Sequence, residues 1–346
     1  MWIKLRSYVL ASFIVSCLIL VGTPKSRAED LYKGKSIRFV LGFSPGGGFD
    51  AYTRAIARHI GKHIPGNPTA IVENMTGAGS LVAANFLYNQ TKPDGLTIGH
   101  FHGGLILGQI LERPGIAFEA RKFKWIGAPA RLEAVCAFSK RSGISNIEKW
   151  TSAQTPPKMG ATAPGSQTYD MPIILNAAAN LPVQVVSGYK GAAEIRLAVE
   201  SGEIDGSCEG WEAMSVNWRK LLEAGDAVVV VQSPSKPLPD LPRVPLAIDL
   251  AKTKEARSII QFGIQDISDI LRPYAAPPGT STEQVAILRK AFSATMQDPE
   301  FLNEMKKARL TVDPMSGEEL ENTIANFFKL EPTVLARFKE ILIPKK

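Results

Sequence analysis

The segment GFSPGGGFD, residues 42–50, resembles a catalytic motif. GFSPG matches the G-x-S-x-G pattern of serine hydrolases, in which a sharp strand-to-helix turn exposes the nucleophile. In that turn the residue after the serine donates its backbone N–H to the oxyanion, and Pro45 has no N–H to donate. No histidine follows His102 to serve as a late base. The sequence therefore argues against hydrolysis.

The same loop is suited to binding an anion. It lacks the G-x-G-x-x-G register of a dinucleotide site, and no Walker lysine follows it. Gly46, Gly47 and Gly48 place three residues without a Cβ at the start of a predicted helix, where backbone N–H groups and the helix dipole favour a carboxylate. Asp50 is predicted to be the N-cap of a helix from about Ala51, and contact with a ligand amine or a bound water is the alternative.

Two further loops with glycine precede predicted helices, TGAGS at 76–80 and APGS at 163–166. Either could be only a turn. Because ligand sites in α/β sheets form where strand ends meet, three such loops indicate a shared cleft. His102 follows a predicted strand and is a candidate polar group of that cleft. Trp211 follows the strand-like segment GEIDGSCEG, and packing is the more ordinary role for it.

The histidines do not indicate a metal site. His59 and His63 are four residues apart, and His100 and His102 are two apart, so each pair could face one way. No H-E-x-x-H motif is present, and a site would need the pairs to converge with added carboxylates. We expect partly exposed histidines, no metal and no cofactor.

Residues 1–28 have the features of a secretory signal peptide. Lys4 and Arg6 precede an uncharged apolar stretch, and Ser26-Arg27-Ala28 offers small residues before a cleavage point. Cleavage removes four basic residues and no acid, so the net charge falls from +7 to +3. The remaining chain has no basic run of five residues and no apolar run near the ~20 needed to span a bilayer, which argues against a nucleic-acid partner and a membrane span.

Two cysteines, Cys136 and Cys208, remain after cleavage. An oxidising compartment permits a disulfide between them, although the sequence does not bring them into contact. Two buried free thiols are an equally good prediction.

Strands, glycine loops and helices alternate along the chain. Ile56, Ile60 and Ile64 recur at helical spacing after the first glycine loop, and similar units follow. Strands are predicted at 37–43, 69–74, 93–101, 133–138 and 182–189, a strand with its glycine loop at 158–168, and helices at 51–64, 81–89, 169–180 and 190–206. This pattern favours a parallel α/β sheet over a sandwich.

Proline and capping residues mark the second half. Residues 232–245 hold five prolines and are predicted to be an extended surface segment, and Gly202 should end a helix. Three helical segments are expected near the end of the chain. Asp298-Pro299 and the pair Ser316 and Glu319 are predicted helix starts.

Five segments resemble a known family in their order and spacing. They are GKSIRFVLGFSPGGGFDAYTR, IVENMTGAGSLVAANFLY, KPDGLTI, VSGYKGAAEIRLAVESGEID and PPGTS. Together they resemble the periplasmic solute receptors of tripartite tricarboxylate transporters, also called Bug receptors, over nearly the whole chain after residue 28. The resemblance implies an α/β, two-domain periplasmic binding protein (Venus flytrap) fold with mostly parallel sheets flanked by helices. Domain 1 would comprise 29–132 and 269–346, and domain 2, inserted in it, 133–268.

The resemblance also implies a ligand site. In such receptors the first glycine loop, partly through water, and the facing loop of the second domain hold the ligand carboxylate. Carried over to this chain, the candidate ligand-binding residues are Phe43, Ser44, Gly46, Gly47, Gly48, Phe49 and Asp50 from the first loop, and Ala163, Pro164, Gly165 and Ser166 from the facing loop. Apart from the resemblance, His102, Tyr189 and Trp211 complete the candidate ligand-binding residues. No catalytic residue is expected.

Two positions depart from the family pattern. Phe49 stands where threonine is common, which removes a hydroxyl and adds an aromatic face. The facing loop reads APGSQTYD, with Tyr169 near the point where a more regular glycine-serine sequence often leads to a histidine. Both departures favour a larger or aromatic carboxylate over the usual small dicarboxylates.

The sequence therefore predicts a periplasmic, monomeric solute-binding protein that passes an organic anion (a di-, tri- or aromatic carboxylate) to a membrane permease of one large and one small subunit. An exported enzyme acting on a small carboxylate or ester is one alternative, but no nucleophile, base and orienting group can be assembled. A ligand-sensing receptor on the same fold is the other, and its sequence would look almost the same.

Overall fold

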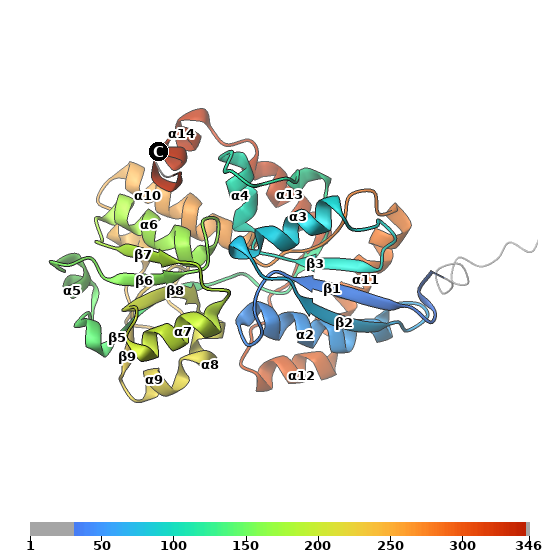
Figure 1. Cartoon of the computed structure of the whole chain (residues 1–346), viewed down its shortest axis with the longest axis horizontal. Coiled ribbons are helices and arrows are strands. Elements are labelled where there is room, and N and C mark those ends of the chain that lie inside the picture. The colour runs from blue at the N-terminus through green and yellow to red at the C-terminus, as the bar shows by residue number, and fades with distance from the viewer. Residues whose placement is uncertain (1–30, 344–346) are drawn as a thin grey trace, which may run out of the picture.

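Residues 31–343 are described by a computed structural model of the chain (Figure 1). The predicted signal peptide, residues 1–28, lies outside the described residues. The described part forms two β-sheets, one of six strands and one of five, with helices packed against them. We call the half of the molecule around the six-stranded sheet the first domain, and the half around the five-stranded sheet the second domain. The predicted two-domain α/β fold is confirmed.

The six-stranded sheet has the strand order β11-β4-β10-β3-β1-β2. Its strands are β1 (Ser36–Leu41), β2 (Thr69–Asn74), β3 (Thr97–His100), β4 (Lys124–Ala128), β10 (Tyr274–Ala276) and β11 (Met315–Ser316). β1 pairs in parallel with β2 and β3, whereas β10 runs antiparallel to β3 and β4. The sheet is thus parallel at one end and antiparallel at the other.

Helices cover the six-stranded sheet. They are α2 (Gly48–Ile60), α3 (Leu81–Asn89), α4 (Gly104–Ile110), α11 (Thr282–Gln297), α12 (Pro299–Lys307) and α13 (Gly317–Phe327). The predicted apolar stripe of α2 is buried, with Ile56 and Ile60 fully enclosed in a core shared with α11 and α12. This packing fixes the start of α2 at the end of β1.

The five-stranded sheet has the strand order β7-β6-β8-β5-β9. Its strands are β5 (Ala134–Ser139), β6 (Lys158–Ala161), β7 (Gln184–Ser187), β8 (Gly206–Gly210) and β9 (Ala227–Gln232). Its helices are α5 (Ile147–Thr151), α6 (Gln167–Ala179), α7 (Ala192–Ser201), α8 (Trp211–Asn217), α9 (Arg219–Glu223) and α10 (Lys254–Ile260). β6 pairs in parallel with β7 and β8, and β5 pairs antiparallel with β8 and β9.

Both sheets are mixed, which corrects the expectation of mostly parallel sheets. The parallel pairs come from the strand–loop–helix units that the sequence pattern predicts. The antiparallel pairs involve β4, β5, β9 and β10, where the chain passes from one sheet to the other and back. A strand that enters from the other domain needs no crossover helix, so it is free to pair antiparallel.

The predicted domain boundaries, at 132/133 and 268/269, stay a prediction. The six-stranded sheet takes its strands from residues 36–128 and 274–316, and the five-stranded sheet from 134–232. The last helix, α14 (Pro332–Leu342), packs against α6, and the Phe338 ring lies 5.2 Å from that of Phe262. The end of the described chain therefore reaches the helices of the second domain (Figure 1).

Most predicted helix ends are confirmed. Asp298 caps α12, Ser316 and Glu319 form a capping box on α13, and Gly202 follows α7 with a φ of 83°. Residues 233–245 contain no helix or strand, as the prolines predict. Four α-helices, not three, follow β10 in the described chain. Among the described residues, no helix is both long and apolar enough to cross a membrane.

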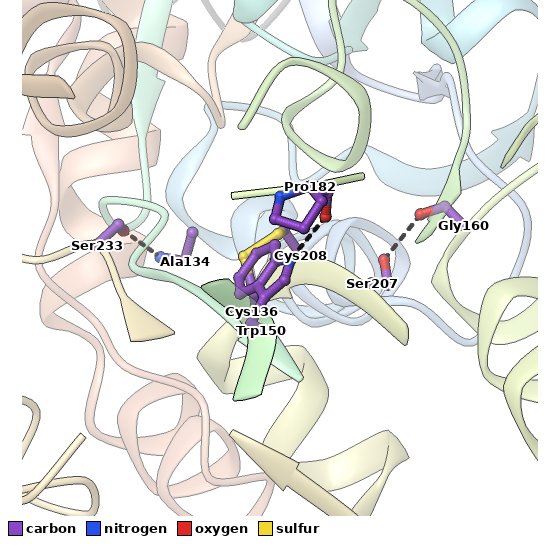
Figure 2. Close-up of a disulfide and its surroundings, with 8 residues drawn as sticks. All are labelled: Ala134, Cys136, Trp150, Gly160, Pro182, Ser207, Cys208 and Ser233. Atoms are coloured by element: carbon purple, nitrogen blue, oxygen red, sulfur yellow. Dashed lines mark hydrogen bonds between the residues drawn. A yellow bond between two sulfur atoms is a disulfide. The ribbon is translucent and has the colours of Figure 1, made fainter. Parts of the chain in front are cut away.

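Cys136 and Cys208 form a disulfide inside the second domain (Figure 2). They lie directly opposite each other on the antiparallel strands β5 and β8, with their Cα atoms 4.0 Å apart. Beside them the Trp150 indole N–H donates to the carbonyl of Pro182 at 2.8 Å. Of the two alternatives left open by the sequence, the disulfide is the one confirmed.

Candidate functional site

A cavity of about 60 Å³ lies between the two domains. On one side its walls come from the loop after β1, from His102 two residues after β3, and from Leu132 and Arg272, where the chain passes between the sheets. On the other side they come from the residues after β6 and β7, from the end of β8 and from α8. A water molecule needs roughly 10–15 Å³ of such space, so the cavity has room for a small molecule. Of the three glycine loops predicted to share a cleft, the loops at 42–48 and 163–166 contribute to this cavity, and the loop at 76–80 does not.

Half of the predicted ligand-binding residues line this cavity. They are Phe43, Ser44, Gly47, Gly48, Phe49, His102 and Ser166. The others lie outside its lining: Gly46, Asp50, Ala163, Pro164, Gly165, Tyr189 and Trp211. Residues that line it without having been predicted are Leu132, Thr162, Gln167, Thr168, Gly191, Ala192, Glu209, Gly210, Ala213 and Arg272.

Asp50 supports the glycine loop from behind. The helix α2 begins at Gly48 with Gly47 as its N-cap, so the prediction that Asp50 is the N-cap is wrong. Gly46 has a φ of 89°, which turns its N–H toward the Asp50 carboxylate at 3.1 Å. Arg54 and Asn74 also donate to this carboxylate. Burial raises the pKa of Asp50, but these hydrogen bonds outweigh burial, so the pKa is lowered overall.

Tyr189 and Trp211 use their polar atoms within the second domain. The Tyr189 hydroxyl donates to Glu203 at 2.6 Å, and the Trp211 indole donates to Asp240 at 3.2 Å. Gly165 donates its N–H to Asp170 at 3.2 Å, so the facing loop is held by its own helix.

Three helices begin at the cavity. The N-cap residues of α2, α6 and α7 are Gly47, Ser166 and Gly191, and all three line the cavity. Gly47 and Gly191 have no side chain to cap their helices, and the Ser166 hydroxyl accepts no backbone N–H of α6. The positive ends of three helix dipoles therefore meet at one small space, which favours a negatively charged ligand.

His102 joins the two domains at the cavity wall. Its Nε2 lies 3.1 Å from the N–H of Gln167 on α6, and its Nδ1 lies 3.1 Å from the N–H of Gly104. Backbone N–H groups only donate, so these contacts favour the neutral ring, which can accept through one nitrogen. Burial, helped by the Arg272 charge and opposed by a backbone hydrogen bond at Gly165, lowers the pKa of His102 to about 3.

Phe49 is part of an aromatic wall in the first domain. Its ring centroid lies 4.5 Å from that of Phe43 and 4.8 Å from that of His100. His100 in turn stacks on Tyr274 at 4.0 Å. His100 is fully buried, and burial lowers its pKa well below the usual value, so it remains neutral. The expectation of partly exposed histidines is wrong for His100 and His102.

Arg272 forms a buried ion pair between the domains. Its guanidinium lies 3.3 Å from the carboxylate of Glu212 on α8, and the two side chains are 1% and 4% exposed. The same guanidinium lies over the rings of Tyr52 and Phe49, 4.7 and 5.8 Å from their centroids. The Arg272 guanidinium is therefore a cationic group at the wall of the cavity.

The two domains also meet around the cavity. Ser44 donates its N–H to the carbonyl of Lys190 at 3.2 Å. Arg113 donates two hydrogen bonds to Asp170, at 3.0 and 2.8 Å, and both side chains are buried. The structure is thus a closed arrangement of the two domains.

One group of side chains away from the cavity has a geometry that could hold a metal ion. Ligand atoms of His59, Asp298 and Glu300 lie within 4.8 Å of one another. The ammonium group of Lys62 lies 2.6 Å from both carboxylates, so a cation of the chain already fills this position.

Comparison with known proteins agrees with this geometry. The model of the family described as "Tripartite tricarboxylate transporter family receptor" matches residues 53–338. A protein of Cupriavidus necator, "UPF0065 protein in gbd 5'region", is 24% identical, and the match covers 93% of this chain and 93% of that protein.

Solved structures share the fold. The periplasmic binding protein BugD superposes with a TM-score of 0.74 at 20% identity, covering 91% of this chain and 100% of that one. MatC from Rhodopseudomonas palustris with bound malate gives a TM-score of 0.70 at 20% identity, covering 90% and 100%. These likenesses confirm the two-domain periplasmic binding protein fold. The match of the family model confirms the resemblance seen in the sequence: this chain belongs to the tripartite tricarboxylate transporter receptor family.

Proposed function

We propose that the chain is an extracytoplasmic solute-binding protein that captures a small organic carboxylate between its two domains. The observation that carries this proposal is the meeting of three helix N-termini, at Gly47, Ser166 and Gly191, on one cavity between the domains. Backbone N–H groups at such ends bind carboxylates without an added cation. The family and the malate in the related MatC structure support the same ligand class.

The volume of the cavity favours a small acid. The sequence alone predicts a larger or aromatic carboxylate, because Phe49 replaces the usual threonine. In the closed structure the Phe49 ring packs on Phe43 and His100, so it fills part of the wall and narrows the cavity. About 60 Å³ suits an acid of a few carbon atoms better than an aromatic one.

The destination of the ligand follows from the family. We infer that the receptor works in the periplasm as a monomer and delivers its ligand to a membrane permease of one large and one small subunit. Deletion of the gene for this chain should abolish uptake of the acid that binds best, and deletion of the permease should have the same effect. Normal uptake in the strain without this chain would contradict the transport role.

Binding is tested with the exported chain, unfolded and refolded to remove any ligand purified with it. Malate, succinate, citrate, adipate and benzoate are screened by thermal unfolding. A ligand at a hundred times its dissociation constant stabilises the native state by about 2.7 kcal/mol, which raises the melting temperature by several degrees. We expect at least one small acid to do this, and benzoate to have no effect.

Closure without chemistry is the second readout. Small-angle scattering should give a smaller radius of gyration with the best acid bound than without it, because only the closed form contacts the ligand with both domains. The acid should be recovered unchanged. Absence of any shift with carboxylates, or the appearance of a reaction product, would contradict the proposed function.

A further inference from the structure

Glu209 is a buried carboxyl group that lines the cavity and has no partner. It lies on β8, is 3% exposed, and neither of its oxygens has a hydrogen-bond partner among the described residues. Ser207, on the same face of β8, is near enough to lower the pKa of Glu209, but its one hydroxyl proton goes to the carbonyl of Gly160 at 2.9 Å. Arg196 is the cation whose charge acts on Glu209, and it pairs with Glu200 at 2.6 Å. The chain itself therefore does not satisfy this carboxyl group.

Burying an unpaired carboxyl group destabilises the folded chain. Glutamate is almost never fully buried unless it is paired, because the charged form is far more stable in water than in a protein interior. Burial raises the pKa of Glu209 to about 8, so without a partner the group carries a proton at neutral pH. A protonated carboxyl group still has an acceptor oxygen with no donor. A cation that enters the cavity would pair with the ionised form and satisfy both oxygens.

The other unpartnered polar atoms at the cavity are donors. Gln167 Nε2 and Arg272 Nε are buried without hydrogen-bond partners among the described residues, and both residues line the cavity. Donors of this kind fit the oxygens of a carboxylate. The cavity thus offers two donors and the start of three helices for an anion, and one carboxyl group that fits a donor.

We propose that the ligand carries a protonated amine as well as a carboxylate, and that Glu209 binds the amine. An ammonium group supplies three donors and one positive charge, so it satisfies both Glu209 oxygens and compensates their charge. A hydroxyl group supplies one donor and no charge, and a second carboxylate supplies neither. This inference rests on the proposed function and narrows its ligand class to amino carboxylates.

Matched pairs of acids test the inference by calorimetry at pH 7. Each pair shares a carbon skeleton and differs only in the amine: acetate and glycine, propionate and alanine, succinate and aspartate, glutarate and glutamate. In the pair that fits the cavity, the amino acid should bind the ligand-free chain at least tenfold more tightly than its amine-free partner.

Glu209→Gln removes the charge and keeps the shape. In this variant the preference for the amino acid should fall to about onefold, while the affinity for the amine-free acid should stay within threefold. Glu209→Met, which removes both oxygens, is the second variant and should give the same loss of preference. Glu203→Gln is the matched control, because Glu203 is bonded to Tyr189 outside the cavity. It should keep the full preference.

The possible results separate the two proposals. If amine-free acids bind as well as or better than their amino partners, the inference is wrong and the proposed function stands. The same holds if the tenfold preference survives in both Glu209 variants, or if those variants bind every acid as the native chain does, because Glu209 would then contact only water. If no member of any pair and none of the acids screened above binds, both proposals fail.

Discussion

The two walls of the cavity differ in the kind of polar group that they leave without a partner. In the first domain, Thr53 bonds to His100 at 2.6 Å and to Tyr274 at 3.0 Å behind the Phe49 ring. Asp50, below the glycine loop, accepts from Gly46 and from two side chains. On this wall the carboxylate is satisfied without a ligand, and the buried atoms left without a partner among the described residues, His100 Nε2 and Arg272 Nε, include no carboxylate oxygen.

The wall of the second domain is different. Glu209 has no partner, and Gln167 Nε2 has none either, although both side chains are buried. The strand β8, which carries Glu209, is also fixed covalently, because the neighbouring residue Cys208 forms the disulfide with Cys136. A fixed strand can hold an unsatisfied group in place for a ligand. The first domain thus offers the ligand a cationic donor, Arg272, and we expect the second, through the unpaired carboxyl group of Glu209, to decide which ligand is bound.

The largest expected effect comes from the disulfide that fixes the second wall. Replacing Cys136 and Cys208 by alanine should lower the free energy of unfolding by about 4 kcal/mol, from the entropy of a 72-residue loop. Urea unfolding of the variant and of the native chain, each without reductant, measures this loss. Labelling of thiols in the unfolded, unreduced exported chain should find none. Two labelled thiols would show that Cys136 and Cys208 are not bonded, and that the second wall is not fixed by a disulfide.

Closure of the two walls is tested at two neighbouring glycines. A Cβ on Gly48 would lie 2.8 Å from Cβ of Ala213 in the second domain, whereas a Cβ on Gly47 meets Ala192 at an ordinary 3.7 Å. Gly48→Ala should therefore weaken binding of the best acid by more than tenfold, or about 1.4 kcal/mol. Gly47→Ala is the matched control and should stay within threefold.

Calorimetry measures both affinities, and the melting temperature of each ligand-free variant is measured beside them. The open form separates Gly48 from Ala213, so the ligand-free Gly48→Ala chain should melt close to the native chain. Equal affinities in the two variants would mean that the walls do not need to meet this closely for binding.

The sequence predicts the first-domain wall of the cavity better than the second-domain wall, for a physical reason. Glycine loops, apolar stripes and capping residues act over a few positions, so the start of α2 is predicted within three residues and Gly202 correctly ends α7. Glu209 lies in the short segment GSCEG, which carries no motif, and a glutamate there is ordinarily expected at the surface. Its burial depends on packing between distant parts of the chain.

Arg272 was missed for a related reason. Its partner Glu212 lies 60 residues earlier, and only the meeting of the two domains brings the side chains together. The prediction for Asp50 failed locally, because Gly48 and Phe49 enter the helix and move its start before Asp50. His102 could be predicted because it directly follows the strand region that ends at the cleft, where polar groups of α/β sites gather.

A smaller effect of pH should come from His102, which contacts both walls. In the closed form the ring is neutral and its pKa is about 3, whereas a ring exposed by opening has an ordinary pKa near 6.5. Between these values the open form binds the extra proton, so closure weakens as the pH falls below about 6.5. The affinity at pH 5.5 should be roughly tenfold lower than at pH 7.5.

His102→Gln isolates this contribution. The glutamine amide oxygen can still accept from the N–H of Gln167 but does not titrate in this range. The titrations of the ligand and of Glu209 affect the native chain and the variant equally. They therefore cancel when the two pH profiles are compared. Identical pH profiles would mean that His102 stays buried and neutral when the domains open.

The smallest effect is expected at Phe49, which limits the size of the cavity from the side of the first domain. Phe49→Thr removes a ring that packs on Phe43 and His100 and lies below the Arg272 guanidinium. The space gained should shift the preference by about threefold to tenfold from the shorter dicarboxylate succinate toward the longer adipate, because a missing contact in an apolar wall is worth only about 1 kcal/mol. Phe49→Leu keeps an apolar side chain and should give a smaller shift in the same direction. Calorimetry with the two acids measures the ratio of their affinities in each chain. A ratio unchanged in both variants would move the control of ligand size to the second wall, which would then set both the size and the charge of the ligand.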